Sequence, residues 1–439
     1  MNYYDAMIVG SGFSGLGTAL ILAKKGLSSL ILEREDHPGG LLKGICRGEH
    51  RLKPLLEMVE KNLRIDLITG AKLRSIGGFH PRFNIQWVKD GRALTADAGH
   101  IVIASGLNLY FPEHLHPAGP GPGIITLPEL EHHVCTTDWS EFKDKRLLMI
   151  CGYNEPNSAY GIQLTLDRSI ALAKAGASVF LAMPDVLFND PEVVDMYRAA
   201  RNAGVLIIRS PEAPVLSGQH PDLSFEAIDP SIVEDHHAAI IHGSIDIVVF
   251  EPEYRPRTLE NIFWSPLKPS TNNQGFYQPD NPTLTPVLSE RKGVYFVGAV
   301  TGFKSLESCR QEAALASAEI SIKHPENPTH AEVDENKCVA CLTCVRICPH
   351  RAIHIDGTAR VAREACDGCG ICAAECPAKA ITMVKEGESF ERSDLVESPE
   401  HIPNWMVLFC CDGSTGPTWD SMKPNPVLKR WHMNAIRVA

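Results

Sequence analysis

Short apolar runs alternate with one helical stretch at the start of the chain. Residues 5–10 (DAMIVG) are apolar, residues 17–26 (GTALILAKKG) have the spacing of a helix, and residues 27–35 (LSSLILERE) form a second strand-like run. The order of strand, glycine-rich turn, helix and strand is typical of a parallel α/β sheet. We therefore predict an α/β fold for this part of the chain.

The same alternation returns further along the chain. Strand-like runs occur at residues 100–106, 146–152, 177–184, 246–250 and 293–300, and helical spacing occurs at residues 158–176 and 307–322. Residues 324–331 (HPENPTHA) contain two prolines and no periodicity, which indicates a linker.

These patterns predict a chain of several parts. They are a split domain of residues 1–115 and 256–323, an inserted α/β domain of residues 116–255, the linker of residues 324–331, a cysteine-rich domain of residues 332–386, and a tail of residues 387–439.

The composition is that of a globular protein and argues against some functions. The 439 residues are 44% hydrophobic and 22% charged, with a formal net charge of −11. No segment is apolar enough to span a bilayer, and the start of the chain lacks the pattern of a signal peptide. We expect a cytoplasmic protein without direct membrane insertion; if it acts at a membrane, partner subunits must hold it there. The acidic balance and the absence of Lys/Arg clusters disfavour nucleic acid as a partner.

Cysteine is concentrated in one region. Of 14 cysteines, eight lie between residues 338 and 376, in the runs CVACLTCVRICP and CDGCGICAAECP. Both runs have the spacing C-x2-C-x2-C-x3-C-P of bacterial ferredoxins with two 4Fe–4S clusters, in which the fourth cysteine of each run binds the other cluster. The predicted ligands are Cys338, Cys341, Cys344 and Cys376 for one cluster, and Cys366, Cys369, Cys372 and Cys348 for the second.

A pair of zinc sites is the alternative interpretation of these cysteines. Zinc ribbons also use C-x2-C pairs, but a tetrahedral ion needs only four ligands and gives no reason for the repeated third and fourth cysteines followed by proline. The spacing therefore favours two 4Fe–4S clusters, close enough together for rapid electron transfer.

The glycine turn GSGFSG indicates a dinucleotide-binding site. Gly10 permits the tight turn, Gly12 lets a pyrophosphate approach the helix amino terminus, and Gly15 allows close packing of helix on strand. Glu33 ends the next strand and would accept hydrogen bonds from an adenosine ribose. An ordinary glycine turn in an α/β unit is the alternative.

Two later strands favour FAD over NAD as the dinucleotide. Residues 101–106 (IVIASG) mark where the chain leaves an FAD domain, and residues 293–302 (GVYFVGAVTG) mark its return toward the flavin. The candidate FAD-binding residues are Gly10, Gly12, Phe13, Ser14, Gly15, Glu33, Gly40, Leu41, Ser105, Gly106, Gly298, Ala299, Lys304 and Ser305.

With these landmarks, residues 1 to about 323 resemble thioredoxin-reductase-like flavoproteins, and more closely the family of heterodisulfide reductase A subunits. Ala299 stands where the reductases have an aspartate, as in that family, and Gly302, Lys304 and Ser305 stand in its Gly-Pro-Lys-Asp stretch. Phe303 and Ser305 replace the proline and the aspartate. The implied fold class is α/β, a thioredoxin-reductase-like two-dinucleotide-binding flavoprotein fold fused to an α+β ferredoxin domain with two 4Fe–4S clusters.

The resemblance implies an oxidoreductase subunit that passes electrons between FAD, two clusters and other redox subunits. The complex would be heterodisulfide-reductase-like or quinone-interacting, and flavin-based bifurcation is compatible with it.

The additional amino-terminal cluster region of full-length family members is absent, so we expect a short form. Residues 405–414 (WMVLFCCDGS) resemble the first strand of a small cluster-binding domain; since only Cys410 and Cys411 remain, we expect a docking extension.

Lys304 is the candidate catalytic residue, because a cation just past the flavin-facing strand would stabilise an anionic reduced flavin. A solvated surface lysine is the alternative.

Two other functions remain open. The first is an NAD(P)H-dependent iron-sulfur flavoprotein reductase, resembling the small subunit of glutamate synthase. Residues 151–161 (CGYNEPNSAYG) disfavour it, because they lack the G-x-G-x-x-A expected of a nicotinamide site. The second is a non-flavin relay scaffold.

The disulfide chemistry of thioredoxin reductases is excluded, because no C-x-x-C precedes Cys338.

Overall fold

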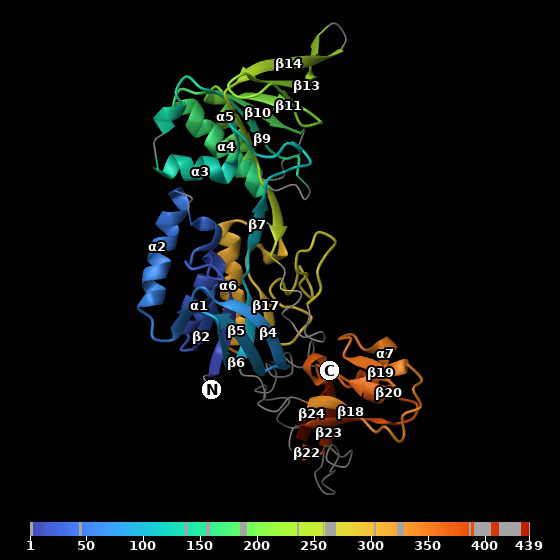
Figure 1. The fold of residues 1–439 in the computed structure, drawn as a ribbon. Helices are drawn as coiled ribbons and strands as arrows, with labels where there is room; N and C mark the ends of the chain where they lie inside the picture. Colours follow the sequence, from blue (N-terminus) through green and yellow to red (C-terminus); the bar gives the residue numbers. More distant parts are fainter. Residues whose placement is uncertain are drawn as a thin grey trace.

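The chain folds into two stacked α/β lobes and a smaller cysteine-rich lobe (Figure 1). The computed structural model describes residues 3–43, 46–136, 139–154, 159–184, 191–234, 237–257, 259, 269–302, 304–322, 329–385, 388–389, 405–411 and 432–438. We call the lobes the dinucleotide lobe (described residues of 3–110 and 253–322), the insert lobe (described residues of 124–250) and the cysteine lobe (described residues of 329–389).

The dinucleotide lobe is built on a seven-stranded sheet of order β3-β2-β1-β6-β5-β4, with β17 pairing to β6. Strands β3, β2, β1, β6 and β17 pair in parallel, whereas β4, β5 and β6 pair antiparallel. The strands are β1 (Tyr3–Val9), β2 (Ser29–Leu32), β3 (Ile65–Ile68), β4 (Lys72–Phe79), β5 (Arg82–Lys89), β6 (Arg92–Ile103) and β17 (Val294–Phe296).

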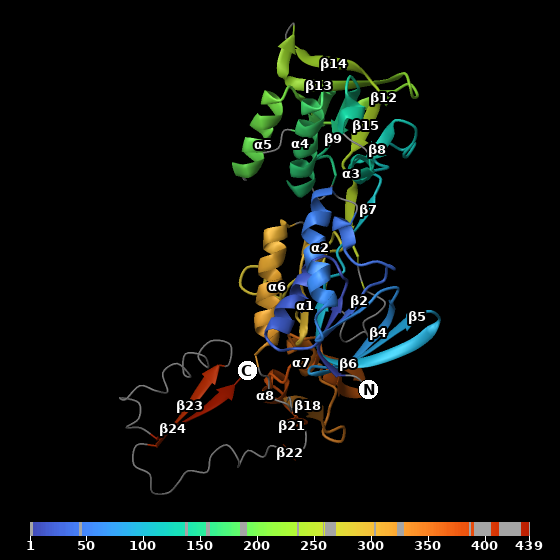
Figure 2. The same ribbon diagram turned by 90° about the vertical axis from the view of Figure 1, so that its left-hand side faces the viewer.

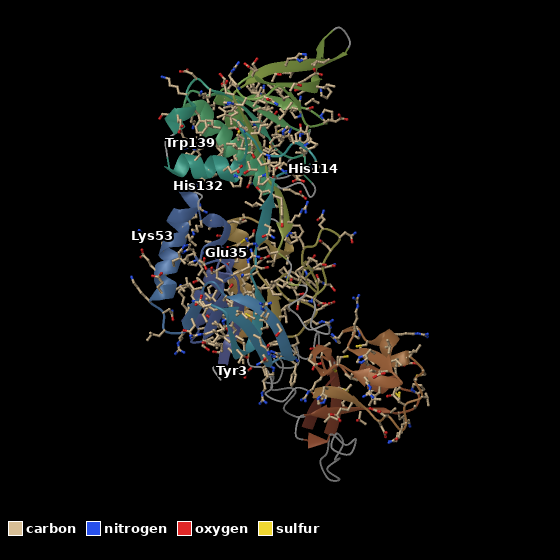
Figure 3. The ribbon with its side chains drawn as sticks, in the orientation of Figure 1. Tyr3, Glu35, Lys53, His114, His132 and Trp139 are labelled. Atoms are coloured by element: carbon tan, nitrogen blue, oxygen red, sulfur yellow. The ribbon has the colours of Figure 1, made fainter. Side chains whose placement is uncertain are left out.

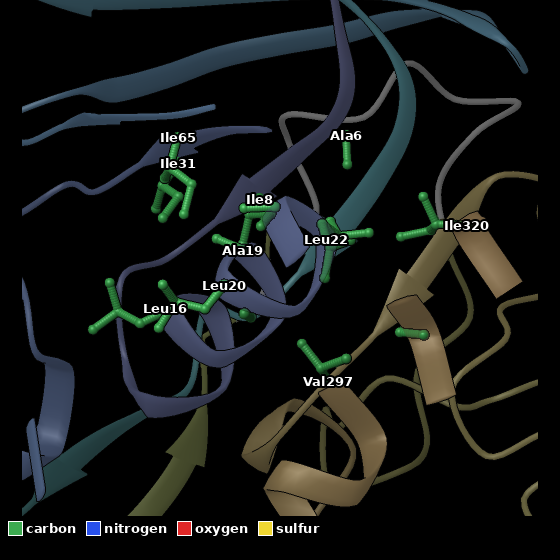
Figure 4. Close-up of a cluster of buried hydrophobic side chains, with 14 of the residues drawn as sticks. Ala6, Ile8, Leu16, Ala19, Leu20, Leu22, Ile31, Ile65, Val297 and Ile320 are labelled. Carbon is green, nitrogen blue, oxygen red and sulfur yellow. The ribbon is translucent and has the colours of Figure 1, made fainter. Parts of the chain in front are cut away.

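Three helices cover this sheet: α1 (Phe13–Lys24), α2 (Cys46–Glu60) and α6 (Leu306–Ile320). Figure 4 shows α1 between the strands and α6, with Ile8, Leu16, Leu22 and Val297 in one apolar cluster. Small side chains let the two helices approach closely, because a Cβ at Gly17 would lie 3.9 Å from that of Ala313. The packing therefore holds the start of α1 beside the start of α6.

The insert lobe is a second parallel α/β unit. Its five-stranded sheet has the order β11-β10-β9-β15-β8, and an antiparallel sheet of order β12-β13-β14 packs beside it. Its elements are β8 (Ile124–Thr126), α3 (Leu127–Thr136), β9 (Arg146–Ile150), α4 (Ala159–Lys174), β10 (Ser178–Met183), α5 (Pro191–Asn202), β11 (Leu206–Arg209), β12 (Val215–Ser217), β13 (Leu223–Glu234), β14 (His237–Ile245) and β15 (Ile247–Phe250). The antiparallel pair β7 (Leu107–Tyr110) and β16 (Glu253–Pro256) joins it to the dinucleotide lobe.

The cysteine lobe consists of two similar halves. Each half carries a short helix, α7 (Thr343–Ile347) or α8 (Ile371–Ala374). The strands are β18 (Thr329–Val333), β19 (Ile353–Asp356), β20 (Thr358–Val361), β21 (Ile381–Lys385) and β22 (Glu388–Ser389). Strand β18 pairs antiparallel with β21, so residues 329–331 of the expected linker belong to a strand. Pairing with β21 satisfies the backbone hydrogen-bonding groups of residues 329–331, although two prolines precede them in the sequence.

In the tail, β23 (Trp405–Cys411) pairs in parallel with β24 (His432–Val438). The backbone of Cys410 and Cys411 lies in β23, but their side chains lie outside the described part of the structure. Across the described residues, no helix has both the length and the apolar character needed to cross a membrane.

The two ends of the central sheet face different neighbours. Figure 3 shows Tyr3, at the start of β1, far from Glu35, which follows β2 on the side of the insert lobe. The carboxyl ends of the parallel strands therefore point toward the insert lobe. Figures 1 and 2 both place the cysteine lobe beside the opposite end, near the amino terminus.

Candidate flavin site and cysteine cavities

In the glycine turn after β1, Gly10 and Gly15 pack tightly against the backbone, whereas Gly12 faces open space. A Cβ at Gly10, whose φ is +104°, would lie 2.5 Å from the carbonyl oxygen of Ala104, and one at Gly15 would lie 2.0 Å from that of Gly10. A Cβ at Gly12, in contrast, would have nothing within 4 Å, and no side chain caps the helix that begins at Phe13. The open amino terminus of α1 can therefore accept a pyrophosphate.

Glu33 is buried at the end of β2, with 6% of its surface exposed. One carboxylate oxygen accepts hydrogen bonds from the backbone N–H (2.9 Å) and hydroxyl (2.7 Å) of Ser11, and the other accepts from the N–H of Glu35 at 2.9 Å. These bonds fix the carboxylate beside the glycine turn. An ionised carboxylate has about four lone-pair sites, so acceptor capacity remains for a ribose hydroxyl.

A second glycine-rich turn approaches the first. The N–H of Gly39 donates to the carbonyl of Ser11 at 3.0 Å, and a Cβ at Gly40 would lie 3.2 Å from the Cα of Gly12. Leu41, within the 3₁₀ turn Gly40–Leu42, is 39% exposed. Gly40 therefore packs directly against the backbone of Gly12, and this contact holds the two turns together.

The chain leaves the dinucleotide lobe at Ser105 and Gly106 and returns beside them. The Ser105 hydroxyl donates to the carbonyl of Arg257 at 2.8 Å, and the Arg257 N–H donates to the carbonyl of Gly106 at 3.1 Å. The guanidinium of Arg257 lies 3.8 Å from the Glu35 carboxylate. Arg257 is thus a cation close to Glu33 and Glu35 that the sequence interpretation missed, because no local motif marks it.

Glu312 organises the segment where the chain returns after β17. Its carboxylate accepts a hydrogen bond from the N–H of Gly298 at 2.8 Å and forms an ion pair with Lys304. The Lys304 ammonium also donates to the hydroxyl of Thr301 at 2.5 Å. Lys304 is therefore not a solvated lysine but a half-buried cation that shares Glu312 with the Gly298–Ala299 turn. Glu312 was missed from the sequence, since it lies eight residues beyond Lys304 on a helix.

The start of α6 faces the start of α1. Ser305 caps α6 by accepting the Ser308 N–H at 3.1 Å, and a Cβ at Gly298 would lie 2.2 Å from the Ser14 hydroxyl. Burial raises the pKa of the Cys309 thiol, although a hydrogen bond with Ser14 opposes that shift. Cys309 is therefore a packed thiol rather than a nucleophile, since the thiolate is the reactive form.

The eight clustered cysteines line two separate cavities. Cys338, Cys341, Cys344 and Cys376 line one cavity, and Cys366, Cys369, Cys372 and Cys348 line the other. Each cavity thus receives three thiols from one run and the fourth from the other run. Among the described residues, no three His, Cys, Asp or Glu side chains converge on a single-ion position. The thiols instead surround a space, an arrangement that fits a polynuclear cluster.

Backbone N–H groups point at the sulfur atoms of these cavities. The N–H of Ala352 lies 3.4 Å from the Cys348 sulfur, that of Ala380 lies 3.3 Å from the Cys376 sulfur, and that of Ala359 lies 3.4 Å from the Cys338 sulfur. Such hydrogen bonds stabilise the negative charge of a thiolate-bound cluster. The cavities therefore offer both the ligands and the polar surroundings that iron-sulfur clusters require.

The corresponding turn of the insert lobe contains a protein carboxylate. Glu251, at the end of β15, is 1% exposed and accepts the N–H of Gly152 at 2.7 Å. Burial raises the pKa of Glu251 to about 7. A Cβ at Gly161 would lie 1.6 Å from this carboxylate, so only glycine fits there. Glu251 therefore occupies the space next to Gly161 near the start of α4.

Two family models match the chain. Residues 331–383 match a 4Fe-4S dicluster domain, and residues 8–53 match an NAD(P)-binding Rossmann-like domain. These matches cover the two parts of the chain in which the glycine turn and the cysteine cavities lie. The chain therefore combines a Rossmann-like dinucleotide-binding unit with an iron-sulfur domain.

The chain is similar to several curated proteins. The chain is 29% identical, over 59% of its length, to the A subunit of the ferredoxin/F(420)H(2)-dependent CoB-CoM heterodisulfide reductase of Methanosarcina acetivorans, of which it covers 35%. It is 27% identical, over 80% of its length, to the iron-sulfur A subunit of the CoB--CoM heterodisulfide reductase of Methanocaldococcus jannaschii, of which it covers 69%. The chain is thus similar to heterodisulfide reductase A subunits, and it spans only about a third of the length of the first of these two relatives.

Solved structures confirm the predicted fold. A thioredoxin reductase of T. acidophilum has a TM-score of 0.51 and 19% identity, with 73% of this chain and 98% of that chain covered. The dinucleotide and insert lobes therefore adopt the thioredoxin-reductase-like α/β fold, and the cysteine lobe is an addition to it.

Proposed function

We propose that this chain is an electron-transfer subunit that passes electrons between one FAD, two 4Fe–4S clusters and the redox subunits of a heterodisulfide-reductase-like complex. The arrangement that carries the proposal is the pair of cavities, each lined by four cysteines from both runs, in one chain with a flavoprotein-type dinucleotide lobe. Cysteine ligation of this kind serves one-electron transfer, whereas a flavin exchanges electron pairs.

The residues around the glycine turn fit FAD. Gly12 leaves room for a pyrophosphate at the amino terminus of α1, and Glu33 would hold the adenosine ribose. Bound FAD would supply two-electron redox chemistry. Lys304 would serve as the cation that stabilises negative charge near the flavin, and Glu312 fixes its position while partly compensating its charge.

Metal and flavin analysis of anaerobically purified protein tests the proposal. We expect about eight iron atoms, about eight acid-labile sulfides and about one FAD for each chain. Zinc in place of iron and sulfide would overturn the assignment of the clusters. If iron and sulfide are present but no yellow chromophore remains after cluster removal, the non-flavin relay scaffold is the function that fits.

Direct oxidation of NADH or NADPH is not part of the proposal. Cys151 stands where the dinucleotide lobe has Gly10. The Glu251 side chain occupies the space next to Gly161 near the start of α4, so the insert lobe lacks the open glycine turn that a nucleotide phosphate requires. We therefore expect neither NADH nor NADPH alone to bleach the flavin absorbance under anaerobic conditions, and rapid bleaching by either would favour the self-contained reductase.

Partner subunits complete the proposal. The relative from Methanosarcina acetivorans is named as dependent on ferredoxin or F(420)H(2), and we extend such partnership with other redox proteins to this chain. A quinone-interacting complex, membrane association through partners, and flavin-based bifurcation extend the proposal further. Isolation of the native complex and identification of its co-purifying subunits tests all three, because each requires a different set of partners.

A further inference from the structure

Side-chain contacts among the described residues join the cysteine lobe to the dinucleotide lobe beside one of its two cavities. The guanidinium of Arg363, in the 3₁₀ turn before Cys366, lies 4.5 Å from the ring centroid of Phe79 in β4. Lys292 lies 3.9 Å from Asp367, the residue after Cys366. Both contacts involve the half that surrounds the cavity of Cys348, Cys366, Cys369 and Cys372, which we call the inner cavity.

Arg291 is the buried cation of this contact. Its side chain is only 7% exposed, and its guanidinium donates a hydrogen bond to the carbonyl of His350, two residues after the inner-cavity ligand Cys348. Glu290 lies 3.9 Å from the same guanidinium and is 25% exposed. His350 and Cys348 both line the inner cavity.

The other half of the lobe has no such cation among the described residues. The two runs repeat with the same spacing, so Ala378 corresponds to His350 and Lys379 to Arg351. Arg351 and Lys379 share a positive φ, +51° and +50°, which shows that the two loops have similar backbones. Cys341 of the other cavity, which we call the outer cavity, is instead exposed to solvent.

We propose that Arg291 raises the reduction potential of the cluster in the inner cavity and holds that half of the cysteine lobe against the dinucleotide lobe. This inference rests on the proposed presence of 4Fe–4S clusters. Arg291 is a positioning residue, since it contacts the cluster loop through the His350 carbonyl.

The physical reason is the addition of negative charge to a cluster on reduction. A cation close to the cluster stabilises the reduced form, and its effect is large when solvent does not screen it. Arg291 satisfies both conditions, because it is buried and remains protonated at any working pH. Lys292 carries the same charge on the same turn, but it is 40% exposed and therefore screened.

Redox titration of the full-length protein, followed by electron paramagnetic resonance, tests the inference. In R291Q we expect the reduction equilibrium constant of one cluster to fall at least tenfold, which is 59 mV for a one-electron couple. R291K should restore most of this loss because it keeps the charge. The matched control K292Q should change either cluster by much less, because it removes an exposed charge.

Two further variants identify which cluster shifts in R291Q and exclude misfolding as the cause of the shift. C341S should alter only the signal of the outer cluster, and the shift caused by R291Q should persist in C341S/R291Q. E290Q leaves Arg291 in place and removes an opposing charge 3.9 Å from it, so the same potential should rise.

The outcomes separate the inference from the proposed function. Wild-type protein without 4Fe–4S signals would refute the proposed function itself. Normal signals whose potentials are equal in R291Q and K292Q, or a shift that falls on the cluster altered by C341S, would overturn only the role of Arg291. Equal effects of R291K and R291Q would reduce Arg291 to a purely structural contact.

Discussion

Among single residues, Gly298 connects the backbone of the candidate flavin site to the first helix. Its φ is +77°, and a Cβ would lie 2.2 Å from the Ser14 hydroxyl and 2.9 Å from the Ser14 Cβ. Its N–H is bonded to Glu312. A side chain at this position would therefore both strain the backbone and separate β17 from α1.

We expect G298A to destabilise the protein by about 2–4 kcal/mol, from a strained φ and an overlap in a packed region. G26A is the matched control, because Gly26 has a φ of +85° and nothing within 4 Å of its Cβ position. G26A should cost only about 1 kcal/mol. Chemical denaturation of the FAD-free proteins measures both, and equal losses would show that the contact with Ser14 is unimportant.

Glu251 makes the stability of the insert lobe depend on pH. Its pKa is raised from 4.5 to about 7 by burial, so the folded state disfavours the charged carboxylate. A raised pKa of an acid means that stability is greatest below the unfolded pKa and falls as pH rises toward the folded pKa. The loss is complete about one pH unit above this pKa, since the carboxylate is then ionised in both states.

E251Q should therefore match the wild type in stability near pH 4.5. At pH 8 its free energy of unfolding should exceed that of the wild type by about 3 kcal/mol, because each unit by which the Glu251 pKa is raised corresponds to about 1.4 kcal/mol. Glutamine can still accept the Gly152 N–H. Urea unfolding of both proteins at several pH values measures the difference, in which titration of the other groups cancels. Parallel pH curves would contradict the prediction.

At the level of secondary-structure elements, a buried ion pair joins two helices of the insert lobe. Glu131 in α3 pairs with Arg168 in α4, and the two side chains are 2% and 5% exposed. Both helices pack on the sheet through apolar residues such as Leu130 and Leu166. The pair therefore fixes how α3 and α4 meet in a region with little water.

We expect R168M to destabilise the insert lobe by about 3–5 kcal/mol, because it leaves the Glu131 carboxylate buried and unpaired. The double variant E131M/R168M should be more stable than R168M, since it removes the uncompensated charge. Thermal unfolding followed by circular dichroism tests the order of the three proteins. A double variant that is no more stable than R168M would refute this explanation.

Across the molecule as a whole, the hydrophobic cores are separate. The two largest cores of the dinucleotide lobe contain buried residues between Ala6 and Ile320, whereas the core of the cysteine lobe lies entirely between Ala331 and Ile381. Polar and aromatic contacts, such as those of Arg291 and Arg363, connect them. Each part therefore has its own source of stability.

We expect a chain of residues 1–322 to fold and to bind FAD while containing no iron. Its cores are complete without the cysteine lobe, and all candidate flavin residues are retained. Flavin absorbance, iron analysis and size-exclusion chromatography of this truncated protein test the prediction. Aggregation together with loss of flavin would show that the cysteine lobe is required for the fold of its neighbour.

Features that depend on local spacing could be predicted from the amino-acid sequence. The glycine turn at Gly10 and Gly12, the strand and helix order, and the sorting of eight cysteines into two sets follow from residues close together in the chain. Local geometry fixes these features, because a turn, a helix face or a ligand loop involves only a few consecutive residues.

Contacts between distant segments, in contrast, became visible only in the folded chain. Glu251 meets Gly152 across 99 positions, and Arg291 meets His350 across 59. Each of these side chains is unremarkable in its own segment, and its role arises from burial beside a group that the fold brings to it. Burial strengthens charge interactions and removes solvent screening, and burial is a property of the packed molecule rather than of any stretch of sequence.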